Sequence, residues 1–147
     1  MRMLAIDPAT KCGWAMSKDI FGTWDLHIKK DESPGMKFIR LRAKLHELHE
    51  SEKLELIIFE RPGGRFKNDI ISHSKLQAVI EEFCAQNDVE QKGYSSKEIK
   101  KFATGKGNAN KLAMINAAKL KLGYQGEDDN EADALWLLYY AKSDLRL

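Results

Sequence analysis

Two short apolar segments of this chain each end in a carboxylate, and they constrain the fold more than any other feature. Residues 3–7 read Met-Leu-Ala-Ile-Asp, and residues 54–60 read Leu-Glu-Leu-Ile-Ile-Phe-Glu. Apolar runs of this length are typical of strands buried on both faces. Functional groups of an α/β sheet collect at the carboxyl ends of its strands, so we expect Asp7 and Glu60 at one sheet edge. Either acid alone could simply mark the point where its strand leaves the core.

The remaining segments complete an α/β pattern of strands and helices. Short links after the first strand predict a three-strand antiparallel meander, and the strand–helix–strand part forces parallel pairing. We therefore predict a mixed five-stranded sheet, a three-strand antiparallel meander plus parallel strands, flanked by helices. Besides the two segments above, the expected strands are 14–18, 21–28 and 89–94, and the expected helices are about 34–52, 68–87, 95–103, 109–122 and 131–142.

Length and composition limit the class of protein. A chain of 147 residues is long enough for one domain with a core and too short for two. No apolar run approaches the roughly 18 residues of a membrane span, and no signal-peptide pattern precedes the first strand. Cys12 and Cys84 are far apart, which favours a reducing cytosol over a zinc site or a disulfide framework. We expect a single domain over residues 1–147, located in the cytoplasm.

A third group of acids lies at the start of the final expected helix. Asp129, Asn130 and Asp133 would share one helix face, because residues three and four apart are neighbours. Asp133 adjoins an apolar run, where an acid without a partner is unexpected. Asp128 and Glu131 are more simply explained as favourable charges near a helix N-terminus.

Converging carboxylates favour one kind of chemistry. Hard oxygen donors select Mg²⁺ or Mn²⁺ over zinc, and two such ions about 4 Å apart can drive phosphodiester hydrolysis. No Gly-x-Ser-x-Gly motif or recognisable Cys/His pair offers another nucleophile. His46 and His49 are expected to face solvent on an amphipathic helix. His73 could lie near the acids, but a surface or capping role is the preferred interpretation.

The charge of the chain is unevenly distributed along its second half. Residues 92–121 hold eight lysines against one acid, whereas residues 122–147 hold six acids against two basic residues. Such an arrangement suits a protein that holds a polyanion beside a divalent metal. From charge alone, two solvated helix faces of opposite sign are the favoured explanation. Ser95 and Glu98 form a capping-box pattern that predicts a helix start inside the basic segment.

Four motifs resemble the RuvC-type Holliday junction resolvases, which belong to the RNase H-like superfamily. LAIDPATKCGWA resembles the strand that carries the first catalytic Asp, and LIIFERP resembles the strand that delivers the catalytic Glu. NEADALWLL resembles the final helix with the last catalytic Asp. IKKFATGKGNANK is similar to the segment that contacts DNA, with Lys100 and Lys111 at its two basic positions. The motifs occur in the family's order over nearly the whole chain, whose short length is more similar to the phage-borne members.

The resemblance implies roles for individual residues. Asp7, Glu60 and Asp133 would be catalytic ligands of Mg²⁺, for which Mn²⁺ could substitute. The family carries an Asp or a His three residues before the last catalytic Asp, where this chain has Asn130. Either Asn130 is a neutral oxygen ligand or Asp129 takes the role. The residues expected to contact DNA are Lys100, Lys101, Lys106, Lys111, Arg65 and Phe66, the last as a candidate wedge whose spacing does not match closely.

The resemblance also implies a substrate and an assembly. The protein would be a homodimer that nicks opposing strands of a four-way DNA junction symmetrically, in the cytosol of a bacterium or a phage-infected cell. The apolar stripe of helix 68–87 could serve that dimer or a monomer core equally. Two alternatives remain open: an RNase H-like nuclease for other branched DNA, hybrids or RNA, and a non-catalytic nucleic-acid-binding module, against which the intact acids argue. An actin-like phosphotransferase would need a duplicated domain, for which 147 residues leave no room.

Overall fold

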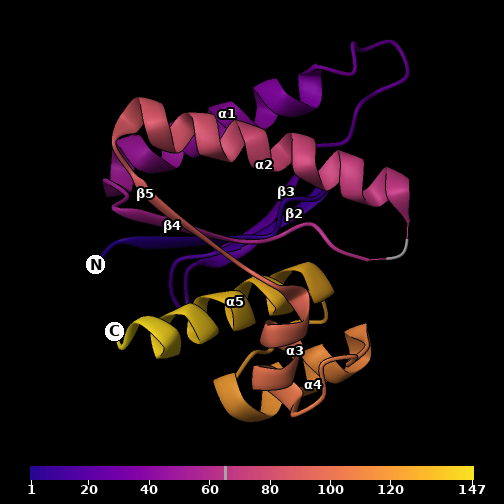
Figure 1. Cartoon of the computed structure of the whole chain (residues 1–147), viewed down its shortest axis with the longest axis vertical. Helices are drawn as coiled ribbons and strands as arrows, with labels where there is room; N and C mark the ends of the chain where they lie inside the picture. The colour runs from indigo at the N-terminus through magenta and orange to yellow at the C-terminus, as the bar shows by residue number, and fades with distance from the viewer. Residues whose placement is uncertain (65) are drawn as a thin grey trace.

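A five-stranded mixed sheet forms the centre of the molecule (Figure 1). The structure, a computed structural model, describes residues 1–64 and 66–147. The spatial order is β3-β2-β1-β4-β5, with antiparallel pairing from β3 to β1 and parallel pairing from β1 to β5. This arrangement confirms the predicted meander and parallel strands. The strands are β1 (Met3–Ile6), β2 (Lys11–Ala15), β3 (Phe21–Asp25), β4 (Leu56–Glu60) and β5 (Glu90–Tyr94).

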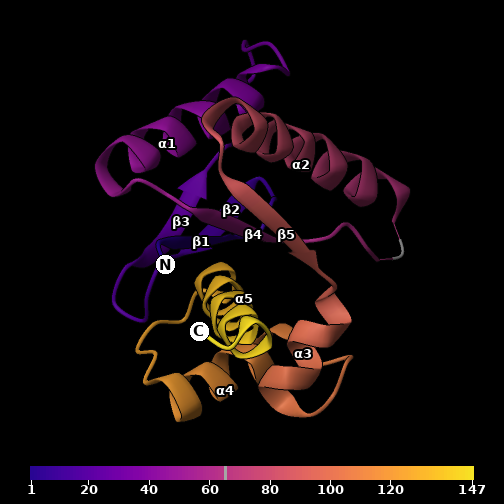
Figure 2. The ribbon, with the colours of Figure 1, turned by 60° about the vertical axis from the view of Figure 1, so that its left-hand side comes forward.

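Helices cover both faces of this sheet (Figures 1 and 2). α1 (Met36–Glu52) and α2 (Lys67–Asn87) lie on one face. α5 (Asp129–Leu145) lies against the other face, and α3 (Ser96–Thr104) and α4 (Lys111–Leu122) pack on its outer side. Among the described residues, no helix is both long enough and apolar enough to span a bilayer.

The alternation of side chains explains why β1 and β4 are apolar throughout. Successive strand residues point to opposite faces of a sheet, and here each face has its own buried cluster. Both strands are therefore buried on both sides, as their sequences predict. Leu4, Ile6, Ile57 and Phe59 belong to the cluster under α1 and α2, whereas Met3, Ala5, Leu56 and Ile58 belong to the cluster under α5.

Polar side chains set the starts of the last three helices. The predicted capping box is confirmed, since Ser95 Oγ accepts from the Glu98 amide and Glu98 accepts from the Ser95 amide. α4 starts at Lys111 rather than at 109 because the Asn110 side chain accepts from the Ala113 amide and ends the preceding loop. α5 starts at Asp129 rather than at 131 because Asp128 is its N-cap, and it runs to Leu145 rather than to 142.

The predicted position of the second strand is wrong by three residues. β2 covers Lys11–Ala15, whereas residues 16–18 belong to the turn before β3. Ser17 Oγ accepts from the amides of Asp19 and Ile20, and this local bonding draws the backbone out of the strand. β3 likewise ends at Asp25, whose side chain accepts from the His27 amide.

Two side chains expected on a particular face lie elsewhere, whereas His46 is exposed as expected. Ile71 was predicted to be buried, but it is 41% exposed in the first turns of α2, which extend past the core. The rings of His46 and His49 lie edge-on to Phe83, with centroids 4.9 and 5.6 Å away. His49 is half-buried rather than solvent-facing, because its Nδ1 accepts from the Leu54 amide at 3.0 Å.

β2 and the first turn of α5 touch at Gly13. A Cβ atom at this position would lie 2.1 Å from the carbonyl oxygen of Asn130, so only glycine allows the backbones to approach. The Gly13 carbonyl in turn accepts from the Asp7 amide at 2.9 Å. Gly13 therefore sets the separation between the end of β1 and the start of α5.

Replacing Gly13 by alanine should strongly destabilise the fold. The added methyl would collide with backbone atoms, which cannot move aside as a side chain could. We expect Gly13→Ala to lower the free energy of unfolding by about 3 kcal/mol, measured by urea denaturation. Gly35→Ala is the matched control, because its Cβ would lie 3.8 Å from the nearest atom, Ser33 Oγ, with φ at −68°. Equal stability of the two variants would contradict the close approach.

Candidate active site

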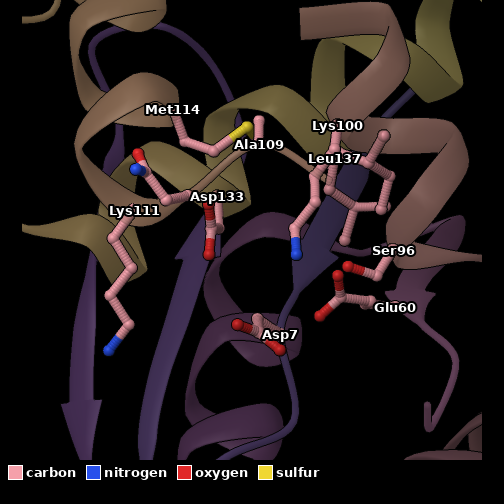
Figure 3. Close-up of a pocket in the computed structure, with 11 residues that line it drawn as sticks. Asp7, Glu60, Ser96, Lys100, Ala109, Lys111, Met114, Asp133 and Leu137 are labelled. Atoms are coloured by element: carbon pink, nitrogen blue, oxygen red, sulfur yellow. The ribbon is translucent and has the colours of Figure 1, made fainter. Parts of the chain in front are cut away.

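Carboxylates from distant parts of the sequence line one pocket of about 330 Å³ (Figure 3). Asp7 directly follows β1, Glu60 ends β4, and Asp133 lies at the start of the second turn of α5. The two strands are parallel neighbours, so their acids meet at one sheet edge as the sequence predicts. Lys100 of α3 and Lys111 of α4 also line this acidic pocket, with Ser96, Ile99, Ala109, Asn110, Met114 and Leu137.

Burial and neighbouring acids raise the pKa of two pocket carboxyls, Asp7 and Asp133. Burial is the main cause of a raised pKa for Asp7, followed by the charges of Glu60 and Asp133. Asp133 has its pKa raised to about 7, first by burial and then by Glu60 and Asp129. Lys100 and Lys111 act in the opposite direction on Asp133. The pocket therefore concentrates negative charge in a partly dehydrated place, which is typical of functional sites.

The donor set of the pocket fits a divalent cation in kind. Among residues 1–64 and 66–147, no three His, Cys, Asp or Glu side chains are arranged, as they stand, so that they could hold a metal ion. Carboxylate oxygens are nevertheless the donors that Mg²⁺ prefers. Asp7, Glu60 and Asp133 all face the same pocket (Figure 3). A cation would remove the mutual repulsion that raises the pKa of Asp7 and Asp133.

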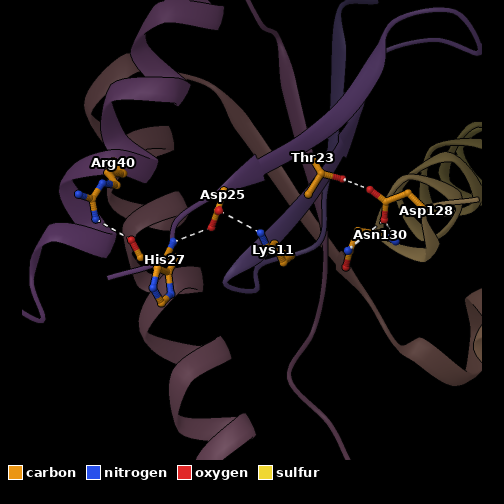
Figure 4. A network of polar contacts seen from close by, with 7 residues as sticks. All are labelled: Lys11, Thr23, Asp25, His27, Arg40, Asp128 and Asn130. Atoms are coloured by element: carbon orange, nitrogen blue, oxygen red, sulfur yellow. Dashed lines mark hydrogen bonds and ion pairs between the residues drawn. The ribbon is translucent and has the colours of Figure 1, made fainter. Parts of the chain in front are cut away.

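A polar network holds the start of α5 and involves Asn130 (Figure 4). Thr23 Oγ1 of β3 donates to Asp128 Oδ2 at 3.0 Å. Asp128 Oδ1 accepts from the backbone amide of Asn130 at 2.8 Å and from its side-chain Nδ2 at 3.1 Å. The structure thus places the Asn130 side chain in the capping network, and Asn130 is not among the residues that line the acidic pocket.

Asp129 does not line the acidic pocket, but its charge acts on the acids there. Its charge raises the pKa of both Asp7 and Asp133. Its carboxylate pairs with Lys111, at 3.6 Å between Oδ2 and Nζ. Of the two residues expected to supply a fourth ligand, Asp129 is therefore the one whose charge the other acids sense.

The residues expected to contact DNA occupy different environments. Lys100 and Lys111 line the acidic pocket, whereas Lys101 and Lys106 are exposed outside it. Phe66 is 67% exposed at the N-cap of α2, and Arg65 lies outside the described residues.

Part of the basic segment has a structural use that the charge count does not reveal. Lys92 pairs with Asp144, and Lys119 pairs with Glu127. Lys121 donates to the Ala103 carbonyl at 2.7 Å and lies over the ring of Trp136. These lysines tie helices and strands together, so the eight lysines do not form one uniform surface for a polyanion.

A larger cavity of about 1010 Å³, here called the basic groove, adjoins the acidic pocket. The two share Glu60, Ser96 and Lys100. Further lining residues that the sequence did not single out for this purpose are Arg61, Gln77, Ser95, Lys97 and Asn108, and His73 lines it as well. The Arg61 side chain lies over Gly93 of β5, where a Cβ would come within 2.7 Å of Arg61 Cγ. Lys97 is one of the eight lysines of residues 92–121, and it lies between the two capping-box residues Ser95 and Glu98.

Comparison with solved structures identifies the fold. Thermus thermophilus RuvC in complex with a Holliday junction substrate superimposes with a TM-score of 0.75 and 17% identity, over 97% of this chain and 95% of that one. A second Thermus thermophilus RuvC structure gives 0.66 and 18%, over 98% and 97%. The yeast mitochondrial Holliday junction resolvase Ydc2 gives 0.59 and 16%, over 98% and 80%. No protein-family model and no curated protein matches the sequence. The chain thus has the RNase H-like fold of these resolvases, which confirms the predicted fold class.

The raised pKa of Asp133 predicts how the stability of the metal-free protein depends on pH. The folded state holds a proton on Asp133 up to about pH 7, whereas the unfolded chain releases it near 3.8. Stability should therefore fall as the pH rises through this window. In EDTA at about pH 8, we expect Asp133→Asn to raise the free energy of unfolding by on the order of 2 kcal/mol, and to have little effect near pH 4.

Asp144→Asn provides a control of opposite sign for this experiment. Hydrogen bonds from Tyr94 and Lys92 lower the pKa of Asp144, so its ionised carboxylate stabilises the folded state. Asp144→Asn removes this charge and should therefore destabilise the protein at the higher pH. Urea denaturation at several pH values measures both variants. A wild-type stability that rises steadily from pH 4 to 8, with no gain in Asp133→Asn, would contradict the assignment.

Proposed function

We propose that this protein is a metal-dependent endonuclease that resolves four-way DNA junctions. The observation that carries the proposal is the meeting of Asp7, Glu60 and Asp133 in a pocket that opens into a groove lined by cations. Nuclease chemistry on a polyanion needs both features side by side. The shared fold with a RuvC bound to a Holliday junction supports the choice of substrate.

In this proposal the acidic pocket binds Mg²⁺, or Mn²⁺ in its place. Asp7, Glu60 and Asp133 hold the ion, and Asp129 completes the site in preference to Asn130, because its charge already acts on Asp7 and Asp133. The bound ions would lower the pKa of an attacking water and stabilise the leaving oxygen. The apolar side chains of Ile99, Met114 and Leu137 limit water around the carboxylates.

The lysines of the pocket would position the scissile strand. Lys100 and Lys111 line the pocket from α3 and α4, opposite the ends of the strands (Figure 3). Their ammonium groups can bind phosphate oxygens on either side of the cleaved bond. Such contacts position the DNA strand in the site but do not distinguish one base sequence from another. The strand would continue into the basic groove past Arg61 and Lys97.

Symmetric nicking of a junction calls for two copies of this site. We propose a homodimer, since a four-way junction presents two equivalent strands and a two-fold dimer presents two equivalent pockets. The exposed Ile71 on α2 is available for such a contact. Phe66 at the start of α2, exposed and apolar, is the candidate wedge at the branch point. Arg65, which precedes it in the sequence, is a further candidate for DNA contact. Lys101 and Lys106 would add outer phosphate contacts.

Loss of any pocket acid should abolish cleavage without abolishing binding. We expect Asp7→Asn, Glu60→Gln and Asp133→Asn each to lower the cleavage rate at least about a hundredfold, because each removes a ligand of the ion. A labelled synthetic four-way junction, incubated with Mg²⁺, Mn²⁺ or EDTA beside linear duplex, measures the cut positions. Wild-type protein should give paired symmetric nicks in the junction only, and only with metal.

The controls for this assay separate the alternatives. Asp31 is an exposed acid that lines neither the acidic pocket nor the basic groove, so Asp31→Asn should cleave as wild type does. Cleavage of forks, RNA–DNA hybrids or RNA in preference to the junction would show that the substrate is not a four-way junction. Tight junction binding with no cleavage under any metal would favour a binding module instead.

Lysine variants should affect binding rather than the ion site. We expect Lys100→Ala and Lys111→Ala to weaken junction binding and to reduce the slope of log K against log salt concentration by about 0.9 for each phosphate that is no longer neutralised. Fluorescence anisotropy in EDTA measures both quantities. Lys44→Ala on α1, on the opposite face of the sheet, is the control and should leave the slope unchanged. Equal slopes in all three variants would exclude the phosphate contacts.

A further inference from the structure

His73 makes a hydrogen bond to the backbone of a proposed ligand residue. Its Nε2 lies 2.6 Å from the carbonyl oxygen of Glu60. A carbonyl oxygen can only accept, so Nε2 carries the hydrogen and donates. Nε2 can donate in both the neutral and the protonated ring, so the contact does not depend on the charge of the histidine. The bond connects α2 to the last residue of β4.

The direction of the strand's backbone groups explains why this carbonyl needs a donor. Backbone groups of successive strand residues point to opposite neighbours. The Leu56 amide donates to the Arg2 carbonyl on the β1 side, and the Arg61 amide donates to the Tyr94 carbonyl on the β5 side. Glu60, four residues after Leu56 and one before Arg61, therefore directs its carbonyl toward β1.

The chain that continues β1 cannot supply this donor. Ile6 is paired with Phe59, so the amide that would reach the Glu60 carbonyl belongs to residue 8. Residue 8 is proline, which has no N–H. The Asp-Pro sequence that ends β1 thus leaves the Glu60 carbonyl without its sheet partner. His73 provides the missing hydrogen from the helix above.

We infer that His73 is a positioning residue for Glu60, and this inference rests on the proposed function. α2 is anchored through Leu76, Val79, Ile80 and Phe83, which are buried between this helix and the sheet. A bond from this fixed helix holds the end of β4 in place, where Glu60 lines one pocket together with Asp7 and Asp133. A metal site needs its ligands held to within about half an ångström. Removing the bond should therefore weaken the ion site as well as the fold.

Direct Mn²⁺ binding, without DNA and without turnover, tests this role. Titration of the full chain followed by the electron paramagnetic resonance signal of free Mn²⁺ gives the affinity. We expect His73→Leu to weaken Mn²⁺ binding about tenfold, as loss of a group supporting a ligand does. His73→Gln, which places an N–H donor at similar reach, should restore most of the affinity. This rescue would not occur if only the volume of the side chain mattered.

His49→Leu is the matched control for general destabilisation. His49 also bonds the backbone next to a strand, through Nδ1 to the Leu54 amide, but lies away from the acidic pocket. We expect its loss to lower the thermal unfolding midpoint in EDTA and to leave the Mn²⁺ affinity unchanged. Circular dichroism confirms that each variant is folded before titration.

The outcomes separate this inference from the proposed function. If wild type and His73→Leu bind Mn²⁺ equally, the inference is wrong while the metal site stands. Equally weak binding by the leucine and glutamine variants also overturns it, because the donor would then be irrelevant. If the wild-type protein binds no Mn²⁺, the proposed function itself fails and leaves no site for His73 to position.

Discussion

The close packing of Gly13 against the first turn of α5 is the constraint on which the rest of the site depends. The Gly13 carbonyl accepts a hydrogen bond from the Asp7 amide. Because glycine has no side chain, the Asn130 carbonyl can pack directly against its backbone. Thr23 and Asp128 reinforce the same junction from β3 (Figure 4). Asp7 and Asp133 are far apart in the sequence, and this contact brings the elements that carry them together. A side chain at residue 13 would separate the two acids that the proposed ion site needs close together.

Holding these acids together works against the stability of the chain. Burial and mutual repulsion raise the pKa of Asp7 and Asp133, so the ionised pocket is unfavourable without a cation. Two apolar clusters, one on each face of the sheet, offset this cost. Local strain of this kind is expected where a fold has been shaped for binding or catalysis rather than for stability. The buried strands are thus the support that permits an electrostatically unfavourable edge.

The sequence predicts the parts of this arrangement that depend on local pattern. Asp7 and Glu60 could be placed at one sheet edge because each ends an apolar run, and Asp133 was conspicuous beside its own apolar run. The contact of His73 with Glu60 could not be predicted, since it depends on strand register and on the missing N–H of Pro8. The end of β2 was placed three residues too late because a single serine, Ser17, bonds the backbone amides of the turn that follows. Pairings through space, rather than patterns along the chain, determine these features.

The lysines of the pocket link the two activities of the proposed function. Lys100 and Lys111 lower the pKa of Asp133, so they partly neutralise the acids in the free protein. When these ammonium groups pair with phosphates, less of their charge is available to the carboxylates. The acids then attract a divalent cation more strongly, and by reciprocity a bound cation frees the lysines for DNA. Substrate and metal would thus favour each other's binding through the same two side chains, which a simple count of basic residues does not reveal.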